Sequence, residues 1–296
     1  MIPSAPLVRA AVRLLGVVPA APVRALARTA GAVGFVVARG RRRTLLDNQR
    51  FLQPAASPTQ RRRAARHTMM NLAEAAVDLY RLPTMGAGEM STLVEVRGRE
   101  HMDAALAMGR GVIAVTAHLG PYELAGAWLA LAGYPVHAMV EELDPQTNAA
   151  LALYREATGM KLLSRNAGIR PVLRLLKEGQ IVVLVADRVV GDGTEGIAVP
   201  FAGGERRIPT GPATLALSTG APLIIGHIAR NQTGATRYIV EMEPPVVASR
   251  TGDGPRDRDR LTRRIASSLA SAVQSHPDQW YVFQPEWARR DASPRN

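Results

Sequence analysis

Short apolar runs that alternate with amphipathic segments constrain this chain more than any other feature. Residues 112–116 (VIAVT) and 181–186 (IVVLVA) contain no charged side chain, which is typical of strands buried on both faces of a sheet. Between such runs the spacing of apolar residues favours helices, and several of these segments are followed by glycine. Strands of about five residues that alternate with helices predict an α/β sheet covered by helices on both faces.

The expected strands are residues 93–97, 112–116, 136–140, 160–164, 181–186, 223–229 and 238–242. The expected helices are residues 67–82, 100–108, 121–132, 145–158, 169–178, 212–219 and 259–275. We expect loops from residue 85 up to the first strand and over residues 187–210, which are rich in glycine. The chain of 296 residues is long enough for one large α/β domain, which we place at residues 67–296.

Several protein classes are excluded by what the sequence lacks. It contains no cysteine, which excludes a disulfide scaffold, an iron–sulfur protein, a zinc ribbon and a cysteine hydrolase. It contains no G-x-S-x-G, P-loop or H-E-x-x-H pattern. Residues 191–196 satisfy G-x-G-x-x-G, but the residues after them do not form a helical pattern, so we expect no dinucleotide there.

The net charge of +12 is concentrated near the N-terminus. Residues 1–66 hold thirteen arginines and one acidic residue, and the other 230 residues are neutral overall. Helical phase places five of these arginines within about 120° of one another: Arg9, Arg13, Arg24, Arg28 and Arg39. We interpret residues 1–66 as basic amphipathic helices that lie on an anionic membrane surface. The alternative is a helical hairpin packed on the body with its arginines in solvent.

Two other roles of this basic region are not expected: spanning a membrane and binding nucleic acid. The longest uncharged runs in it have ten residues, whereas a spanning helix needs roughly 20 consecutive apolar residues, so no transmembrane segment is expected. The region is also almost free of aromatic residues, which disfavours nucleic acid because single-stranded bases stack on aromatic rings.

The most informative stretch is His118-Leu-Gly-Pro-Tyr-Glu123, which directly follows an apolar strand. Pro121 favours the start of a helix, with Glu123 in its first turn. A strand–turn–helix can fold the carboxylate back toward the histidine. A carboxylate bonded to one imidazole nitrogen fixes the tautomer and leaves the other nitrogen as a general base. The alternative is a helix-start carboxylate beside a turn histidine that is satisfied by its neighbours.

This stretch resembles the H-x4-D/E motif of glycerolipid and lysophospholipid acyltransferases. More narrowly, it resembles the branch with the lipid A lauroyl and myristoyl acyltransferases and the actinobacterial phosphatidylinositol mannoside acyltransferases. Further stretches resemble segments of that branch in the same order: Tyr154-Arg155 before Gly159, Ala186-Asp187-Arg188, Val199-Pro-Phe-Ala-Gly, and Arg207-Ile-Pro-Thr-Gly-Pro-Ala213. The resemblance covers roughly residues 93–228. It implies a mixed, mostly parallel sheet with a helical basic N-terminal region.

The resemblance also implies an activity. His118 would take a proton from an acceptor hydroxyl, which then attacks the thioester of acyl-CoA or of an acyl-carrier protein, with Glu123 orienting the histidine. The implied acceptor is a glycolipid, first of all a phosphatidylinositol mannoside, or alternatively a lysophospholipid. The enzyme would be peripheral, at the cytoplasmic face of the cell membrane, and would need no cofactor or metal. Two rivals are a non-catalytic lipid-binding protein with this fold and a metal-dependent hydrolase, which the isolated histidines disfavour.

Further residues are expected to bind substrate. Guanidinium groups bind phosphates through paired hydrogen bonds, so we expect Arg155, Arg188 and Arg207 to hold phosphates of the donor or the lipid; surface ion pairs are the alternative for each. The resemblance adds Glu141, unless it is a solvated helix-start residue, and an acid from the long loop. Val189 stands where that branch has an acid, so either Glu195, our choice, or Asp192 would approach His118. The other five histidines are expected to be structural.

Overall fold

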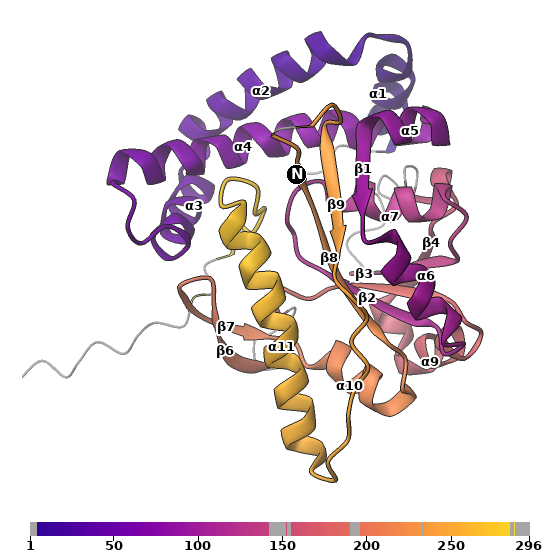
Figure 1. Ribbon diagram of the computed structural model, residues 1–296. Helices are drawn as coiled ribbons and strands as arrows, with labels where there is room; N and C mark the ends of the chain where they lie inside the picture. The colour runs from indigo at the N-terminus through magenta and orange to yellow at the C-terminus, as the bar shows by residue number, and fades with distance from the viewer. Residues whose placement is uncertain are drawn as a thin grey trace, which may run out of the picture.

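A computed structural model describes residues 5–141, 152, 155–189, 196–232, 234–284 and 287 of the chain. Seven strands form one sheet in the order β1-β9-β8-β2-β5-β3-β4 (Figure 1). They are β1 (Val94–Arg97), β2 (Val112–Thr116), β3 (Val136–Val140), β4 (Lys161–Ser164), β5 (Ile181–Val185), β8 (Leu223–Arg230) and β9 (Tyr238–Met242). These are the expected strands, with ends that differ by one residue at most.

Most neighbouring strands of the sheet are parallel. β2 pairs in parallel with β5 and β8, and β3 pairs in parallel with β4 and β5. β9 runs antiparallel to β8 and parallel to β1. The last two strands at that side of the sheet, β1 and β9, therefore run in the opposite direction to the other strands. The prediction of a mixed, mostly parallel sheet is confirmed.

Helices cover both faces of this sheet, as predicted. One face carries α5 (Ala87–Leu93), α6 (Arg99–Ala107) and α7 (Tyr122–Leu131), and the other carries α9 (Ile169–Lys177), α10 (Gly211–Thr219) and α11 (Gly254–Ser275). Figure 1 shows α11 in yellow along its face. Successive residues of β2 alternate between the two cores: Ile113 and Val115 belong to the α11 side, Val112 and Ala114 to the α7 side. This alternation is the period-2 geometry of a strand.

Four helices form the N-terminal layer: α1 (Ala5–Val17), α2 (Ala20–Val37), α3 (Arg39–Leu52) and α4 (Pro58–Arg81). In Figure 1, α2 lies along α4 above the end of the sheet. α4 begins before residue 67, where we expected its start, because Ser57 and Gln60 form a capping box and Pro58 occupies the first turn. The proposed boundary between residues 66 and 67 therefore lies inside a helix.

Two of the five arginines expected on one membrane-facing stripe, Arg24 and Arg28, point inward instead. The Arg24 Nε–H donates to Asp78 Oδ1 at 2.7 Å, and the Arg28 Nη1–H donates to Glu74 Oε1 at 3.0 Å. Both carboxylates are buried in α4, and a buried carboxylate requires charged or hydrogen-bonding partners. The face of α1 and α2 that is left outside is mostly apolar, with Leu14, Val17, Leu26, Val33, Val36 and Val37 exposed, and it also carries Arg13 and Thr29.

Within the described part of the chain, α2 has the length and composition of a membrane-spanning helix. It has 18 residues with a mean hydropathy of 1.2, and 11% of it is buried. The expectation of no transmembrane segment rested on uncharged runs and stays a prediction, because length and mean hydropathy alone do not show that α2 crosses a membrane. Arg24 and Arg28 lie within this helix and hold it against α4.

Two segments expected to be loops have regular structure. Residues 87–93 form α5. The segment 187–210 contains a hairpin of β6 (Ile197–Phe201) and β7 (Gly204–Ile208), whose turn residues Ala202 and Gly203 both have positive φ, as two-residue hairpin turns require. The high glycine content of this segment concealed the alternation of exposed and buried residues in β6. Most of the helix expected at residues 145–158 lies outside the described residues.

Candidate active site

His118 and Asp187 meet at the carboxyl edge of the sheet. They follow the ends of the neighbouring strands β2 and β5, and His118 Nδ1 lies 2.6 Å from Asp187 Oδ1. The backbone N–H of His118 donates to Asp187 Oδ2 at 3.0 Å. The Asp187 side chain is 0% exposed and that of His118 is 18% exposed. The arrangement can hold the imidazole in one orientation while its outer edge remains accessible.

The surroundings keep Asp187 ionised. Burial by itself raises the pKa of a carboxyl group, but the charge of His118 and hydrogen bonds from His118 and Trp280 lower the pKa of Asp187 to about 2. An ionised carboxylate at Nδ1 stabilises the imidazolium that forms when the other nitrogen takes up a proton. The pair therefore has the charge arrangement of a general base.

Glu123, the carboxylate expected to orient His118, is engaged elsewhere. It lies in the first turn of α7, and its carboxylate accepts hydrogen bonds from Arg155 Nε at 3.0 Å and from Arg155 Nη2 at 2.5 Å. Both side chains are 13% exposed. The expected role of Glu123 is therefore corrected: Asp187 occupies the position at Nδ1, because strand β5 lies beside β2, and Glu123 holds Arg155.

Two aromatic residues at the site were not singled out from the sequence. Tyr122 packs edge-on against the His118 ring, with centroids 5.3 Å apart, and burial raises its pKa far above the usual value. Trp280 donates its indole N–H to Asp187 Oδ2 at 2.7 Å. Tyr122 lies within the H-x4-E stretch, so the motif was a signal for it. Nothing local to Trp280 pointed to a site.

The remaining expected site residues are only partly brought together. Arg188, next to Asp187, reaches Glu141 at the end of β3, with Nη2 and Oε2 3.5 Å apart. Arg207 is exposed on β7 and donates to the Gly196 carbonyl oxygen at 2.8 Å. Glu195 and its alternative, Asp192, lie outside the described residues. Arg188 and Glu141 thus form an ion pair near the dyad, and Arg207 lies on strand β7 of the hairpin.

A narrow apolar cavity of about 50 Å³ begins beside the dyad. It runs between α7 and the sheet and is lined near His118 by Thr116 and Tyr122, and farther in by Ala125, Leu129 and Met102. Its lining is mostly aliphatic, with His227 among the exceptions, and its volume accommodates only a few carbon atoms of a hydrocarbon chain.

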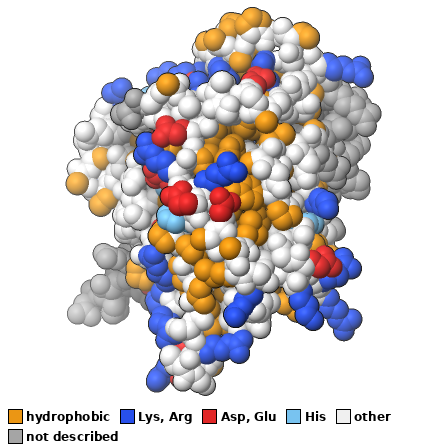
Figure 2. Space-filling view, turned by 45° about the vertical axis from the view of Figure 1, so that its right-hand side comes forward, with side chains coloured by type: hydrophobic (Ala, Val, Ile, Leu, Met, Phe, Trp, Pro, Cys, Tyr) orange, Lys and Arg blue, Asp and Glu red, His pale blue; other side chains and the backbone are white. Residues whose placement is uncertain are grey.

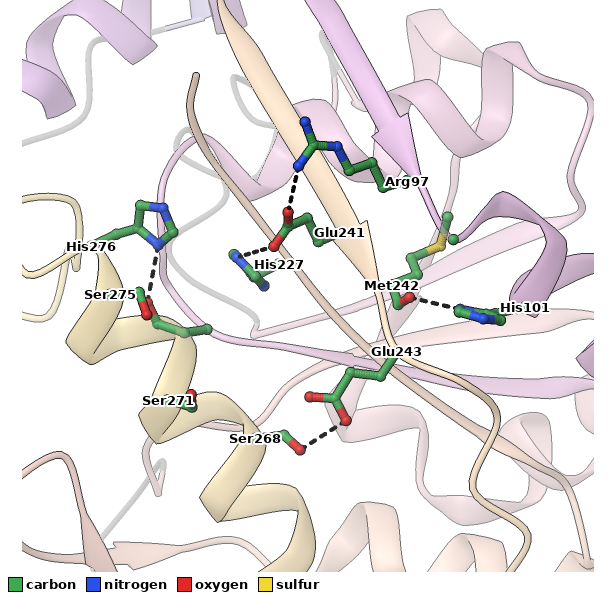
Figure 3. A pocket seen from close by; sticks show the side chains of 12 residues that line it. Arg97, His101, His227, Glu241, Met242, Glu243, Ser268, Ser271, Ser275 and His276 are labelled. Atoms are coloured by element: carbon green, nitrogen blue, oxygen red, sulfur yellow. Dashed lines mark hydrogen bonds and ion pairs between the residues drawn. The ribbon is translucent and has the colours of Figure 1, made fainter. Parts of the chain in front are cut away.

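A second, polar cleft of about 470 Å³ lies between α11 and the edge of the sheet. Figure 3 shows Arg97, Glu241 and His227 in line, with His276 on the other side of the cleft, directly after α11. The His227 and His276 rings are 5.5 Å apart. Burial, followed by the charge of His276, lowers the pKa of His227 to about 4 despite the nearby Glu241. The cleft therefore holds a neutral imidazole at neutral pH. Among the described residues, no group of three or more His, Asp or Glu side chains is placed to hold a metal ion.

The fold and the dyad together define a class, that of α/β enzymes with an imidazole–carboxylate pair at the carboxyl edge of a mostly parallel sheet. Within that class, the chain belongs to the bacterial lipid A biosynthesis acyltransferase family, whose family model matches residues 4–289. It is therefore a member of a family of enzymes that transfer acyl groups, as the H-x4-E stretch and the segments after it suggested.

Individual relatives show which enzymes of the family this chain is similar to. The chain is 31% identical over 218 residues to a phosphatidylinositol mannoside acyltransferase of Mycobacterium tuberculosis, a match that covers 71% of this chain and 66% of the relative. It is 30% identical to the enzyme of the same name from Mycolicibacterium smegmatis, covering 71% and 67%. A lipid A biosynthesis acyltransferase of Haemophilus influenzae is 24% identical, covering 67% and 60%. The matches thus span about two thirds of the relatives' length.

Proposed function

We propose that this protein transfers a fatty acyl chain from a thioester donor to a hydroxyl group of a glycolipid, with His118 as the general base. The observation that carries the proposal is the bond between His118 Nδ1 and the buried Asp187, which leaves Nε2 as the nitrogen that takes up a proton. Relatives named phosphatidylinositol mannoside acyltransferases support such a mannoside as the acceptor.

The proposed reaction has two proton transfers. His118 Nε2 takes the proton of the acceptor hydroxyl as its oxygen attacks the thioester carbonyl carbon. A carbon–oxygen bond forms and the carbon–sulfur bond breaks, and the imidazolium returns the proton to the leaving thiolate. The buried Asp187 carboxylate stabilises the imidazolium between the two proton transfers. The acyl group passes directly from the donor to the acceptor. A covalent acyl-enzyme would require an activated serine or cysteine nucleophile, and the proposal includes none.

The donor proposed is acyl-CoA, with acyl-carrier protein as the alternative, and no separate cofactor is needed. The apolar cavity beside Tyr122 supports a role in receiving the acyl chain. Arg207 is exposed on β7, and we assign it to a phosphate group of the donor or the lipid. Arg155 and Arg188 are each paired with a carboxylate. They would either hold the segments around the site in place or exchange that carboxylate for a phosphate group of the substrate.

We further propose that the N-terminal layer attaches the enzyme to the cytoplasmic face of the membrane as a peripheral protein. The apolar outer face of α1 and α2 supports this role, since exposed apolar patches mark membrane contacts. Figure 2 shows hydrophobic side chains gathered at the top of the molecule, where α2 lies, with basic side chains below them. Exposed arginines of α3 and α4, among them Arg43 and Arg62, would contact anionic headgroups.

Acyl transfer by the purified full-length chain tests the proposal. Acyl-CoA or acyl-carrier protein is supplied as donor with vesicles that contain a phosphatidylinositol mannoside, a lysophospholipid or neither. The expected result is thiol release and an acylated mannoside detected by mass spectrometry, both lost in His118→Ala. Acylation of the lysophospholipid alone would change the acceptor. Vesicle binding without any thiol release would indicate the non-catalytic lipid-binding protein instead.

A further inference from the structure

The segment that follows α11 packs directly against the turn that carries His118. The Tyr281 N–H donates to the His118 carbonyl oxygen at 2.8 Å, and the Gly120 N–H donates to the Gln279 carbonyl oxygen at 2.8 Å. Leu119 and Trp280 thereby form an antiparallel bridge. Backbone hydrogen bonds thus hold the chain on both sides of Leu119, although the two segments are far apart in the sequence.

Trp280 also contacts the dyad through its side chain. Its Nε1–H donates to Asp187 Oδ2 at 2.7 Å, while Asp187 Oδ1 faces His118 Nδ1. The same Oδ2 accepts the backbone N–H of His118. Three donors therefore fix the plane of one carboxylate that is 0% exposed, and a buried carboxylate depends on such donors.

The indole is itself held in place. It is 1% exposed, its ring centroid lies 5.8 Å from that of Phe201 on β6, and the Arg206 guanidinium lies 5.0 Å from its centroid. Arg206 lies equally close to a second indole, that of Trp287, at 5.0 Å. A packed ring with two torsion angles presents its N–H in one direction. It cannot act as an acid or base near neutral pH, so it does not compete with His118 for the proton.

We infer that Trp280 is a positioning residue for the acyl transfer proposed above: its indole N–H fixes the Asp187 carboxylate so that Oδ1 faces His118 Nδ1 and Nε2 faces the acceptor. Without this N–H, Oδ2 keeps only a backbone donor, and the carboxylate can rotate away from the imidazole. The inference rests on the proposed function for its kinetic consequence, but not for the geometry of the dyad. Trp280 also contributes to the lowered pKa of Asp187.

Trp280→Phe tests the inference, because it removes the N–H and retains an aromatic ring. We expect kcat to fall by about tenfold to a hundredfold, since a hydrogen bond to a charged group is lost, and KM to change less than about twofold. The matched control is Trp287→Phe. Trp287 packs on the same Arg206 but donates its N–H to Asn48 Oδ1 at 2.7 Å, away from the dyad, so kcat should stay near wild type.

A second readout does not depend on activity. The proton between His118 Nδ1 and Asp187 gives a downfield NMR signal, which should weaken or shift in Trp280→Phe and persist in Trp287→Phe. An unchanged signal and kcat in Trp280→Phe would overturn the inference, as would an equal loss of kcat in both variants. If the wild type shows no acyl transfer, the proposed function fails while the NMR comparison still decides the positioning role.

Should Trp280→Phe not fold, site-specific replacement of Trp280 by 3-benzothienylalanine keeps the ring size and exchanges only the N–H for sulfur. The same loss of kcat and of the downfield signal is expected. A fully active, folded benzothienyl enzyme with an unchanged His118 signal would show that the N–H has no positioning role.

Discussion

His118 lies two residues beyond the end of β2, and Asp187 lies two residues beyond the end of the neighbouring strand β5. Thr116 of β2 and Val185 of β5 are partners in the parallel ladder, and the Ala186 N–H continues the ladder to the Thr116 carbonyl oxygen at 2.9 Å. The side chains two positions on therefore meet at the carboxyl edge. This edge is the usual place of ligand sites in open α/β sheets.

The first prediction distinguishes the role of Asp187 from that of Glu123, the two carboxylates considered as partners of His118. His118→Ala should lower kcat by about 10²–10⁴-fold, and Asp187→Asn should cause a comparable loss because an amide presents the wrong partner to Nδ1. The double variant should be hardly worse than the more impaired single one, since the pair acts as a unit.

Glu123→Gln is the matched control for the dyad. It should lower the melting temperature, because the Arg155 side chain, which is 13% exposed, loses the negative charge of Glu123, and should affect kcat less than Asp187→Asn does. Thiol-release assays and thermal melts of the four variants provide the comparison. A larger kcat loss for Glu123→Gln than for Asp187→Asn would restore Glu123 as the orienting carboxylate.

The second prediction concerns Arg207. Arg207→Ala should raise KM for the donor or the acceptor on the order of tenfold, since the proposed role is charge-assisted phosphate binding. Arg256→Ala is the control, because Arg256 is 86% exposed in the first turn of α11 and pairs with Asp253, three residues before it. Steady-state kinetics with both substrates varied measures the effect. Equal KM values for Arg207→Ala and wild type would remove Arg207 from the site.

The third prediction concerns the apolar cavity. Ala125→Leu adds carbon atoms to its lining and should raise KM for long-chain donors more than for short-chain donors, because overpacking costs about 1–3 kcal/mol in a filled site. Ala130→Leu on the same helix, whose residue does not line the cavity, should leave the chain-length profile unchanged. Donors of two to sixteen carbons provide the series. A profile that shifts equally in both variants would argue against this cavity as the acyl site.

The fourth prediction concerns membrane attachment. Leu26→Glu combined with Val33→Glu places two charges on the exposed apolar face of α2 and should weaken sedimentation with anionic vesicles by at least about tenfold, since charges are costly in the hydrocarbon region. Val247→Glu changes an apolar residue that is 54% exposed and lies outside the N-terminal layer, and it should bind like wild type. Unaltered binding of the double variant would exclude α2 as the contact.

The fifth prediction follows from the lowered pKa of His227, which is about 4 in the folded protein against about 6.5 in an unfolded chain. Between these values the unfolded state binds the extra proton, so the free energy of unfolding should fall as the pH is lowered from 6.5 toward 4. His227→Gln should reduce that fall by about 2 kcal/mol between pH 7 and pH 4.5. Urea unfolding at pH 7 and pH 4.5 measures it, and identical pH dependence in the two proteins would contradict the shift.

Much of the fold could be predicted from local patterns. A strand such as β2 is four consecutive apolar residues followed by a threonine, and buried strands of a parallel sheet require a largely apolar composition whatever surrounds them. The hairpin β6–β7 and helix α5 were missed, because their signals are short and mixed with glycine. The arginines of α2 were misplaced because helical phase does not show that Glu74 and Asp78, about fifty residues later, are buried opposite them.

By itself, the sequence determined the seven strands of the main sheet, most of the helices and the position of His118 after a strand within an H-x4-E stretch. Only the tertiary structure decided which acid contacts His118. Strand order places β5 beside β2 and so brings Asp187, 69 residues away, to Nδ1, while α7 turns Glu123 toward Arg155. The return of the chain after α11 adds Trp280 from 93 residues away. Local spacing specifies secondary structure, whereas hydrogen-bond partners at a sheet edge depend on strand neighbours that no local pattern encodes.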